Sequence, residues 1–433
     1  MKLAIALLIN LLLGVGLVWW LRRERRQAPL NLRRWLLPAL AGRLLLTAAV
    51  WRWPSPDGQF IQEWSRGLTA ELAQHPALAG ALLNGSEVHL NGYNFPFYSL
   101  SNTLFCLKIL ALLNFASLGS EWLNALYISL FCFVGCWLLA RNWQRALPAT
   151  PPAALVLALL LWPSVVWWTA GITKEALLLG SETALLALVL PALYGPLPTV
   201  PAGWPRRVSK LLLVMLLSWV SFRIRYFFAA PLLGGLLALA AGRWAGCRGW
   251  LGSGWRPQVG ALLAVLALEA GAAVVWGGRH FELSYFSEET NKNYQFELRQ
   301  SRDQPHLEYA DWDPSPAGLL RHAPQAALQT LARPWLGESP RLSYLVAGLE
   351  NALLLMLLGL ALVAAVRGGR SSRQPVALVV FLLLYCLLLA AFIGLNTPNL
   401  GTLHRYRTAL LPWLLLLALP AALARPAAPV PLV

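Results

Sequence analysis

Residues 376–395 form the segment VALVVFLLLYCLLLAAFIGL, in which twenty consecutive positions carry no charged side chain. At 1.5 Å of rise per residue, a helix of this length spans about 30 Å, the thickness of the hydrocarbon core of a bilayer. The segment is apolar on every side, whereas a helix of a soluble protein carries an apolar stripe along one side. It is therefore predicted to be a transmembrane helix.

Similar apolar blocks recur along the chain. Of its 433 residues, 58% are hydrophobic and only 12% are charged, which is too little charge for the surface of a soluble protein of this size. The predicted spans are residues 3–20, 35–52, 121–140, 152–170, 175–194, 210–222, 227–242, 258–276, 344–366, 376–395 and 408–424. We expect an all-α fold, a single polytopic membrane domain of residues 1–433 with about ten or eleven transmembrane helices and with interfacial helices in its outer loops.

The first span resembles the apolar part of a signal peptide. No small-x-small cleavage site follows it, and a run of arginines between residues 22 and 26 follows instead. We therefore expect a retained helix.

The basic residues predict the orientation of the chain. They gather in segments 22–34, 141–145, 206–210, 243–256 and 367–373 and at Arg425, which together hold 18 of the 35 Lys and Arg residues and one acid, Glu24. Because cytoplasmic loops carry the excess of Lys and Arg, the N-terminus is predicted to lie outside and the C-terminus in the cytoplasm.

This orientation gives the outer side two long loops, at about residues 53–120 and 277–343. Long loops in a compact fold are usually functional. The stretch 99–116 in the first loop is apolar but contains Asn102, Lys108 and Asn114, so it is predicted to be an interfacial or re-entrant helix.

The net charge of +16 raises the possibility of a nucleic-acid partner. The basic residues form no single patch or stripe, so no nucleic-acid binding is expected. The five cysteines contain no C-x-x-C pair and are expected to be small buried hydrophobes, with no zinc or haem signature.

Asp57 follows the second predicted span, in WPSPDG at residues 53–58. A carboxylate at this boundary can act as a general base towards a sugar hydroxyl, or hold a metal near a phosphate. The alternative is a plain turn, because Pro-Asp-Gly is good turn chemistry.

Lys174 and Glu175 end the motif PSVVWWTAGITKE at residues 163–175, where two predicted spans meet in an outer turn. An adjacent charged pair at a membrane boundary is costly unless it is solvated, paired or lining a cavity. The alternative for Glu175 is a favourable position at a helix N-terminus.

Arg223 and Arg225 interrupt an apolar stretch, in SFRIRY at residues 221–226, on the predicted outer side. Two arginines there can clamp a phosphate or pyrophosphate through charge-assisted hydrogen bonds. Alternatively, they anchor the membrane exit by reaching towards headgroups.

The motif NTPNLGTLHRYR at residues 396–407 is a predicted outer turn between the last two spans. Gly401 permits an unusual backbone geometry, and His404, Arg405 and Arg407 add up to three cationic groups. A polyanionic lipid headgroup is the simplest ligand for them, and membrane anchoring is the alternative.

Three further acids inside predicted spans are Glu182, Glu269 and Glu350. Glu350, near the start of an apolar run, is expected to pair with an outer arginine. Glu182 and Glu269 lie deeper, where a carboxylate either pairs with a basic residue or serves as a proton-relay group of a transporter.

A leading span, an outer loop that opens with Asp57, and interfacial helices resemble the C-type membrane glycosyltransferases that use polyprenyl-phosphate sugars. Segments 163–175 and 399–407 are similar to sequences of bacterial envelope polysaccharide proteins, including O-antigen polymerases, whose outer loops carry arginines. The chain departs from the family pattern because Asp57 stands without a second acid two residues away and no large soluble domain follows at the C-terminus.

The resemblance implies an enzyme of the bacterial inner membrane that transfers a sugar at the outer face, from or onto a polyprenyl-linked carrier. It implies Asp57 as catalytic base and a set of substrate-binding residues: Lys174, Glu175, Arg223, Arg225, His404, Arg405 and Arg407. The implied partners are membrane lipids, a polyprenyl-linked saccharide and envelope-assembly proteins. No cofactor is implied, and the use of a divalent metal stays open.

Three other functions stay open at this point. An O-antigen-type polymerase would repeat the same transfer. A transporter or flippase for an anionic lipid or solute would use the same arginines for binding and Glu182 and Glu269 for coupling. A non-catalytic assembly protein of a polysaccharide export complex would need none of them.

Overall fold

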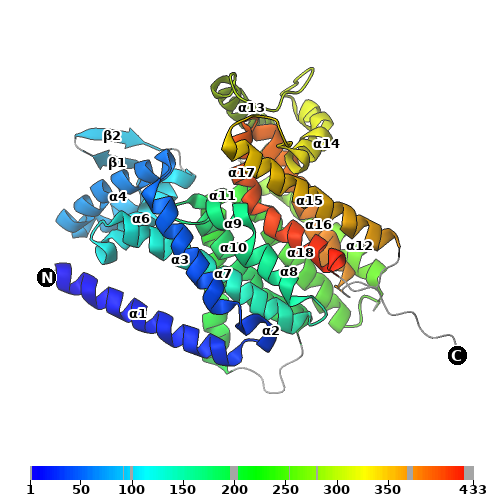
Figure 1. Cartoon of the computed structure of the whole chain (residues 1–433), viewed down its shortest axis with the longest axis horizontal. Coiled ribbons are helices and arrows are strands. Elements are labelled where there is room, and N and C mark those ends of the chain that lie inside the picture. Colours follow the sequence, from blue (N-terminus) through cyan, green and yellow to red (C-terminus); the bar gives the residue numbers. More distant parts are fainter. Residues whose placement is uncertain are drawn as a thin grey trace. The chain divides into compact units, whose positions relative to one another are not determined.

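A computed structural model of the chain describes residues 2–90, 92–97, 101–195, 203–252, 254–278, 281–367 and 374–423. The predicted inner-face residues Arg370, Arg373 and Arg425 and the C-terminus lie outside the described residues. The described part is helical almost throughout, which confirms the predicted all-α membrane fold (Figure 1). The single domain predicted for residues 1–433 is packed as two compact units, which are described separately below.

Unit 1 comprises Met1–Ala146, Leu159–Leu161 and Val165–Ala229. Its elements are α1 (Lys2–Gln27), α2 (Leu30–Arg33), α3 (Leu36–Arg52), α4 (Pro56–Gln74), the short 3-10 helix η1 (Pro76–Leu78), α5 (Ala79–Asn84), β1 (Glu87–Leu90), β2 (Tyr93–Pro96), α6 (Asn102–Ser117), α7 (Glu121–Ala146), α10 (Lys174–Tyr194) and the first part of α11 (Trp204–Cys247). The two strands pair antiparallel, with Glu87 opposite Pro96.

Helices α7 and α10 form the packed centre of unit 1. A Cβ atom added to Gly135 of α7 would collide with the backbone oxygen of Gly180 in α10. Small residues at facing positions allow two membrane helices to approach closely and pack by van der Waals contact.

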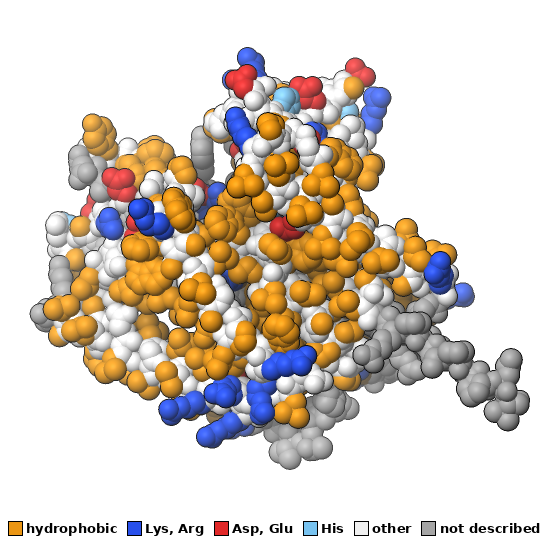
Figure 2. Space-filling model, viewed as in Figure 1, with side chains coloured by type: hydrophobic (Ala, Val, Ile, Leu, Met, Phe, Trp, Pro, Cys, Tyr) orange, Lys and Arg blue, Asp and Glu red, His pale blue; other side chains and the backbone are white. Residues whose placement is uncertain are grey.

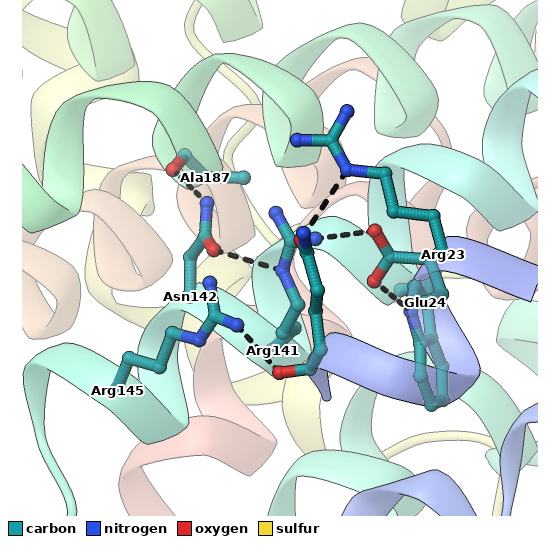
Figure 3. Close-up of polar contacts among 8 residues, drawn as sticks. Arg23, Glu24, Arg141, Asn142, Arg145 and Ala187 are labelled. Carbon is teal, nitrogen blue, oxygen red and sulfur yellow. Dashed lines mark hydrogen bonds and ion pairs between the residues drawn. The ribbon is translucent and has the colours of Figure 1, made fainter. Parts of the chain in front are cut away.

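Helix α1 touches the rest of unit 1 mainly through polar groups, since only 6% of its apolar window is buried. Near its middle, Asn10 donates a hydrogen bond to the Ala116 oxygen at 2.8 Å and accepts one from the Tyr127 hydroxyl. Near its end, Glu24 accepts hydrogen bonds from Arg141 and from the Trp137 indole (Figure 3). Glu24 is 1% exposed, so the single acid among the arginines predicted to face inwards is a buried anchor.

Helix α4 was not predicted as a separate element of the first outer loop. Its residues Ile61, Ser65, Leu68 and Leu72 are buried and recur at helical spacing, so α4 presents one face to the protein. That face packs on α6, which is the predicted interfacial or re-entrant helix.

Unit 2 comprises Leu147–Ala158, Trp162–Ser164 and Ala230–Val433. Its elements are α8 (Pro152–Val156), the remainder of α11, α12 (Trp255–Trp276), α13 (Leu283–Gln300), α14 (Pro316–Ala332), α15 (Leu342–Val366), α16 (Val376–Asn396), α17 (Leu400–Tyr406), the 3-10 turn η4 (Arg407–Ala409) and α18 (Leu411–Ala422). The helices α13 and α14 occupy the second outer loop and pack against α16. Between them lies a small core that includes Tyr294, Tyr309 and Leu319.

Seven helices of the described residues are long and apolar enough to cross a membrane. The predicted spans 35–52, 152–170 and 408–424 correspond to shorter or broken helices, and spans 210–222 and 227–242 both fall within α11. Figure 2 shows hydrophobic side chains over most of the visible face, as expected for helices that meet lipid.

The described helices are interrupted at two places, one within the predicted span 152–170 and one between the predicted spans 210–222 and 227–242. Residues 152–168 form α8, a π-helical turn at Leu157–Leu161, and then α9 (Pro163–Trp168), with Trp162 extended at φ −62° and ψ 122° between them. Pro163 explains the break, because proline disfavours a helical conformation in the residue before it. In α11 the break lies at Arg225, with φ −154° and ψ 86°.

Candidate functional site

The N-terminus of α4 positions Asp57. Ser55 caps the helix by accepting a hydrogen bond from the Gly58 nitrogen at 3.1 Å, and Pro56 occupies the first turn. A Cβ atom on Gly58 would lie 3.0 Å from the Ile172 oxygen, so the glycine lets α4 begin against the loop before α10. WPSPDG therefore begins a helix instead of forming the plain turn that was the alternative.

That loop and the start of α10 position Lys174 and Glu175. Gly171 has a positive φ of 83°, and its nitrogen donates a hydrogen bond to Ser129. Thr173 caps α10 by accepting a hydrogen bond from the Ala176 nitrogen. Lys174 Nζ lies 3.3 Å from an Asp57 carboxylate oxygen and donates a hydrogen bond to Thr103 Oγ1 at 2.9 Å.

The break in α11 positions Arg225 beside Glu175. Arg225 Nη2 lies 2.8 Å from Glu175 Oε1, and the two side chains are 9% and 3% exposed. Glu175 also lies in the first turn of α10, where the helix dipole favours a negative charge. Glu175, predicted to bind substrate, therefore lies in a buried ion pair with Arg225.

Arg223 lies two residues before that break, with its guanidinium 5.4 Å from the centre of the Phe105 ring in α6. Lys108, one helical turn further along α6, donates a hydrogen bond to the Gly85 oxygen at 2.6 Å. Burial and the nearby charge of Arg223 lower the pKa of Lys108. In the sequence, Lys108 was only a polar residue within the apolar stretch 99–116. Its position beside Arg223 became apparent from the structure.

We call these six residues the unit 1 charge cluster: Asp57, Lys108, Lys174, Glu175, Arg223 and Arg225. Cys106 of α6 lies among these residues, since the charges of Lys174, Asp57, Glu175 and Arg225 all affect the pKa of its thiol. The largest cause is burial, which raises this pKa to about 12. The cluster combines four cations with two carboxylates. Asp57 is its accessible acid, with a side chain 32% exposed. Such a site can attract an anion and offer a base beside it.

Arg43 of α3 supports this cluster indirectly, through residues that precede Lys174. This arginine was not identified as a site residue from the sequence. It is 4% exposed and donates hydrogen bonds to the Val166 oxygen at 3.0 Å and to Thr169 Oγ1 at 2.8 Å. It therefore holds the segment that leads into the loop before Lys174. An arginine inside a predicted span was the signal that could have found it.

In unit 2, residues 399–407 form a short helix instead of an outer turn. Asn399 caps α17 by accepting a hydrogen bond from the Thr402 nitrogen at 2.9 Å. Gly401 is helical and does not use the unusual backbone geometry that a glycine permits. Arg405 is half-buried and acts electrostatically on Glu297 of α13, which is also within hydrogen-bond distance of Thr402.

Glu350 of α15 joins two motifs that the sequence treated separately. It accepts hydrogen bonds from the Ser164 hydroxyl at 2.5 Å and from the Ser164 nitrogen at 3.1 Å. His404 Nε2 lies 4.0 Å from the same carboxylate. Arg407 acts electrostatically on Glu350, as expected for an outer arginine, while Ser164 and His404 lie closer to the carboxylate.

His404 and Arg407 differ from the exposed cations that the sequence suggested. Burial, with the charge of Arg407, lowers the pKa of His404 to about 3, so its imidazole is neutral at pH 7. Arg407 is 2% exposed and donates hydrogen bonds to the Arg333 oxygen and to Asn351 Oδ1. Of the three predicted cations of this motif, Arg405 is half-buried and Arg407 is buried, whereas His404 is neutral.

No group of three or more His, Cys, Asp or Glu side chains that could hold a metal ion occurs within the described ranges. Metal binding through a smaller set of ligands and substrate phosphates is a separate question, since Mg²⁺ is often held by one or two carboxylates.

Comparison with known proteins finds no match. This holds for protein-family models, for curated proteins and for solved structures.

Proposed function

We propose that this protein is a membrane glycosyltransferase that acts on a polyprenyl-phosphate-linked sugar in envelope polysaccharide or glycolipid assembly. The observation that carries the proposal is the 3.3 Å pair between Asp57 and Lys174, set in a cluster with more cations than carboxylates. A lipid-linked phosphate supplies the missing negative charge, and a carbohydrate hydroxyl supplies a proton for Asp57. The proposed location is the outer face of a bacterial inner membrane.

Asp57 is the proposed general base. It is the more exposed carboxylate of the cluster, whereas Glu175 is 3% exposed and bound to Arg225. The acceptor hydroxyl would lose its proton to Asp57 as its oxygen bonds to the anomeric carbon of the donor sugar. The bond between that carbon and the carrier phosphate breaks, and the phosphate leaves with the electron pair. General-base catalysis of this kind contributes about 10²–10⁴-fold to a rate.

Arg223 and Lys108 are the proposed phosphate-binding cations of unit 1. The charge of Arg223 acts on Lys108 and lowers its pKa, so the two cations lie near each other and a bound anion would relieve their repulsion. Preorganised cations stabilise the charge that develops on a departing phosphate. Arg405 is the proposed phosphate ligand of unit 2. A polymerase of the O-antigen type would use the same chemistry repeatedly.

The test is a comparison of Asp57→Asn with Glu63→Gln in the native host. Glu63 is an exposed acid on the same helix and serves as the matched control. At equal abundance in the membrane, Asp57→Asn is expected to lower the rate of sugar transfer at least about 100-fold. Surface glycan should fall, and a polyprenyl-linked precursor should accumulate. Normal glycan and lipid profiles in Asp57→Asn would contradict the proposal.

A second candidate is transport of an anionic lipid or solute. The observation that favours it is the pair of interrupted helices, at Trp162 and at Arg225, since transporters bind substrates at unwound helix segments. Glu182 is fully buried in α10, and Glu269 packs on Gly234, where an added Cβ atom would lie 2.6 Å from Oε2. Transport would depend on an ion gradient and would be lost in Glu182→Gln or Glu269→Gln, with Asp57→Asn still active.

A further inference from the structure

A cavity of about 350 Å³ lies in unit 1 between α1, α4 and α6. Its walls include Ile5 of α1, Ala70 and Ala73 of α4, and Phe115 and Leu118 at the end of α6. The volume falls in the range of pockets that hold small organic ligands. The walls are mostly apolar, so the occupant must present hydrocarbon to them.

The two uncharged polar side chains in the wall, Thr69 and Asn114, already have hydrogen-bond partners. Thr69 Oγ1 lies 3.0 Å from the Ala111 oxygen and accepts a hydrogen bond from Asn114 Nδ2. Asn114 also donates to Ser65, and its Oδ1 accepts from Asn124 at 2.7 Å. Because these groups form their hydrogen bonds within the protein, the occupant needs no polar group in the interior of the cavity.

Arg66 also lines this cavity and gives it a charge. Its Nε and Nη2 atoms donate hydrogen bonds to the Gly119 oxygen at 3.0 and 2.8 Å, which fixes the guanidinium against the end of α6. Its Nη1 atom has no hydrogen-bond partner, and its guanidinium no salt bridge, within the part of the chain that the structure describes. An exposed, oriented guanidinium is well suited to a phosphate group.

The position of the cavity along the helices matches the boundary between headgroups and acyl chains. Gly119 lies two residues before α7, and Ile5 lies in the first turns of α1. Helices α1 and α7 run in the same direction, because Asn10 meets Tyr127 and Glu24 meets Arg141. The cavity therefore lies at the end of unit 1 where α1 and α7 begin, beside α1, of whose apolar window only 6% is buried.

We propose that this cavity holds one acyl chain of an anionic phospholipid whose phosphate binds Arg66. The site is separate from the unit 1 charge cluster, since Arg66 follows Asp57 by nine residues of α4, or about 14 Å of helix. The bound lipid bridges α1 to the α4–α6 pair and adds contacts to a helix that otherwise has few. The inference does not rest on the proposed sugar transfer.

The test is native mass spectrometry of the delipidated, full-length protein with phosphatidylglycerol and phosphatidylcholine of identical acyl chains. The wild type is expected to retain one phosphatidylglycerol molecule. It should bind this lipid about fivefold more tightly than phosphatidylcholine, which is the effect of one favourable headgroup charge. Arg66→Gln is expected to keep the lipid and lose the preference. Ala70→Trp and Ala73→Trp, which fill the cavity, are expected to lose the retained lipid.

Two matched controls separate the cavity from the rest of the lipid-facing surface. Ala264→Trp introduces the same side chain at an exposed position of α12, and Arg207→Gln removes an exposed arginine of α11. Both are expected to behave as the wild type. Equal retention of the two lipids by the wild type, retention in both cavity-filling variants, or displacement of phosphatidylglycerol by polyprenyl phosphate would each overturn the assignment.

Discussion

Asp57 and Glu175 show at the residue scale how surroundings assign different roles to two carboxylates. Asp57 keeps 32% of its side chain exposed beside Lys174. Glu175 is almost fully buried and is held by Arg225 at 2.8 Å. A base must reach its substrate, so Asp57 suits proton transfer, whereas Glu175 fixes the arginine at the break in α11.

His404 gives a pH prediction at the same scale. Its pKa of about 3 in the folded protein lies below the ordinary value of 6.5. As the pH falls below about 6.5, the unfolded chain takes up a proton that the folded protein refuses, so stability is lost between pH 6.5 and pH 3. This loss amounts to about 2 kcal/mol at pH 5 relative to pH 7.5. Thermal unfolding in detergent at both pH values measures it.

The variant His404→Gln is expected to lack this part of the pH dependence. His75→Gln is the control, because His75 is an exposed histidine at the end of α4. If His404→Gln and the wild type lose the same stability between pH 7.5 and pH 5, the claim that the His404 imidazole is buried and neutral in the folded protein is refuted.

The sequence predicted several site residues but not their partners. Asp57, Lys174 and Arg225 stood out because charges at membrane boundaries need a reason. Lys108 and Arg43 were missed because each lies within an apolar helix, and only the packing of α6 and α3 reveals what surrounds them. Likewise, the neutral state of His404 depends on burial that no local sequence pattern reports.

At the element scale, α1 is a span held by a few polar contacts. Since only 6% of its apolar window is buried, the carboxylate of Glu24 carries much of its attachment to α7. Removing one partner of a buried ion pair is costly because the other charge stays buried. Figure 3 shows Arg141 and Glu24 facing each other, with Arg145 and Asn142 beside them.

Glu24→Gln is therefore expected to loosen the end of α1. Trypsin should cleave the protein between residues 22 and 26 at least about tenfold faster in mild detergent, since local opening exposes the arginines and 1.4 kcal/mol corresponds to a factor of ten. Glu63→Gln serves as the control on α4. An unchanged cleavage rate in Glu24→Gln would show that other contacts hold α1.

The helices themselves were predicted better than their interruptions. Apolar length is a local property, so the spans at α7, α10, α12, α15 and α16 follow from composition. The break at Trp162 could have been inferred from Pro163. The break at Arg225 falls between the predicted spans 210–222 and 227–242, where two arginines interrupt the apolar stretch, but its ion pair with Glu175 is a tertiary contact that the sequence does not report.

At the scale of the whole molecule, the distribution of arginines predicts one orientation. In a cysteine-free variant, a cysteine at Asp303 is expected to react with a membrane-impermeant maleimide added to intact cells. A cysteine at Arg207 is expected to react only after permeabilisation. Both positions are exposed in the structure. The reverse pattern would invert the topology and move the unit 1 charge cluster to the cytoplasmic side.

The binding of polyprenyl phosphate to the purified protein tests most directly whether the unit 1 charge cluster holds a lipid-linked phosphate. Arg223→Gln and Lys108→Gln are each expected to weaken binding about tenfold, the loss of one charge-assisted hydrogen bond. Asp57→Asn, which leaves every cation in place, is expected to bind at least as tightly as the wild type. Arg207→Gln is the control. Wild-type affinity in a folded Arg223→Gln/Lys108→Gln double variant would contradict the central claim.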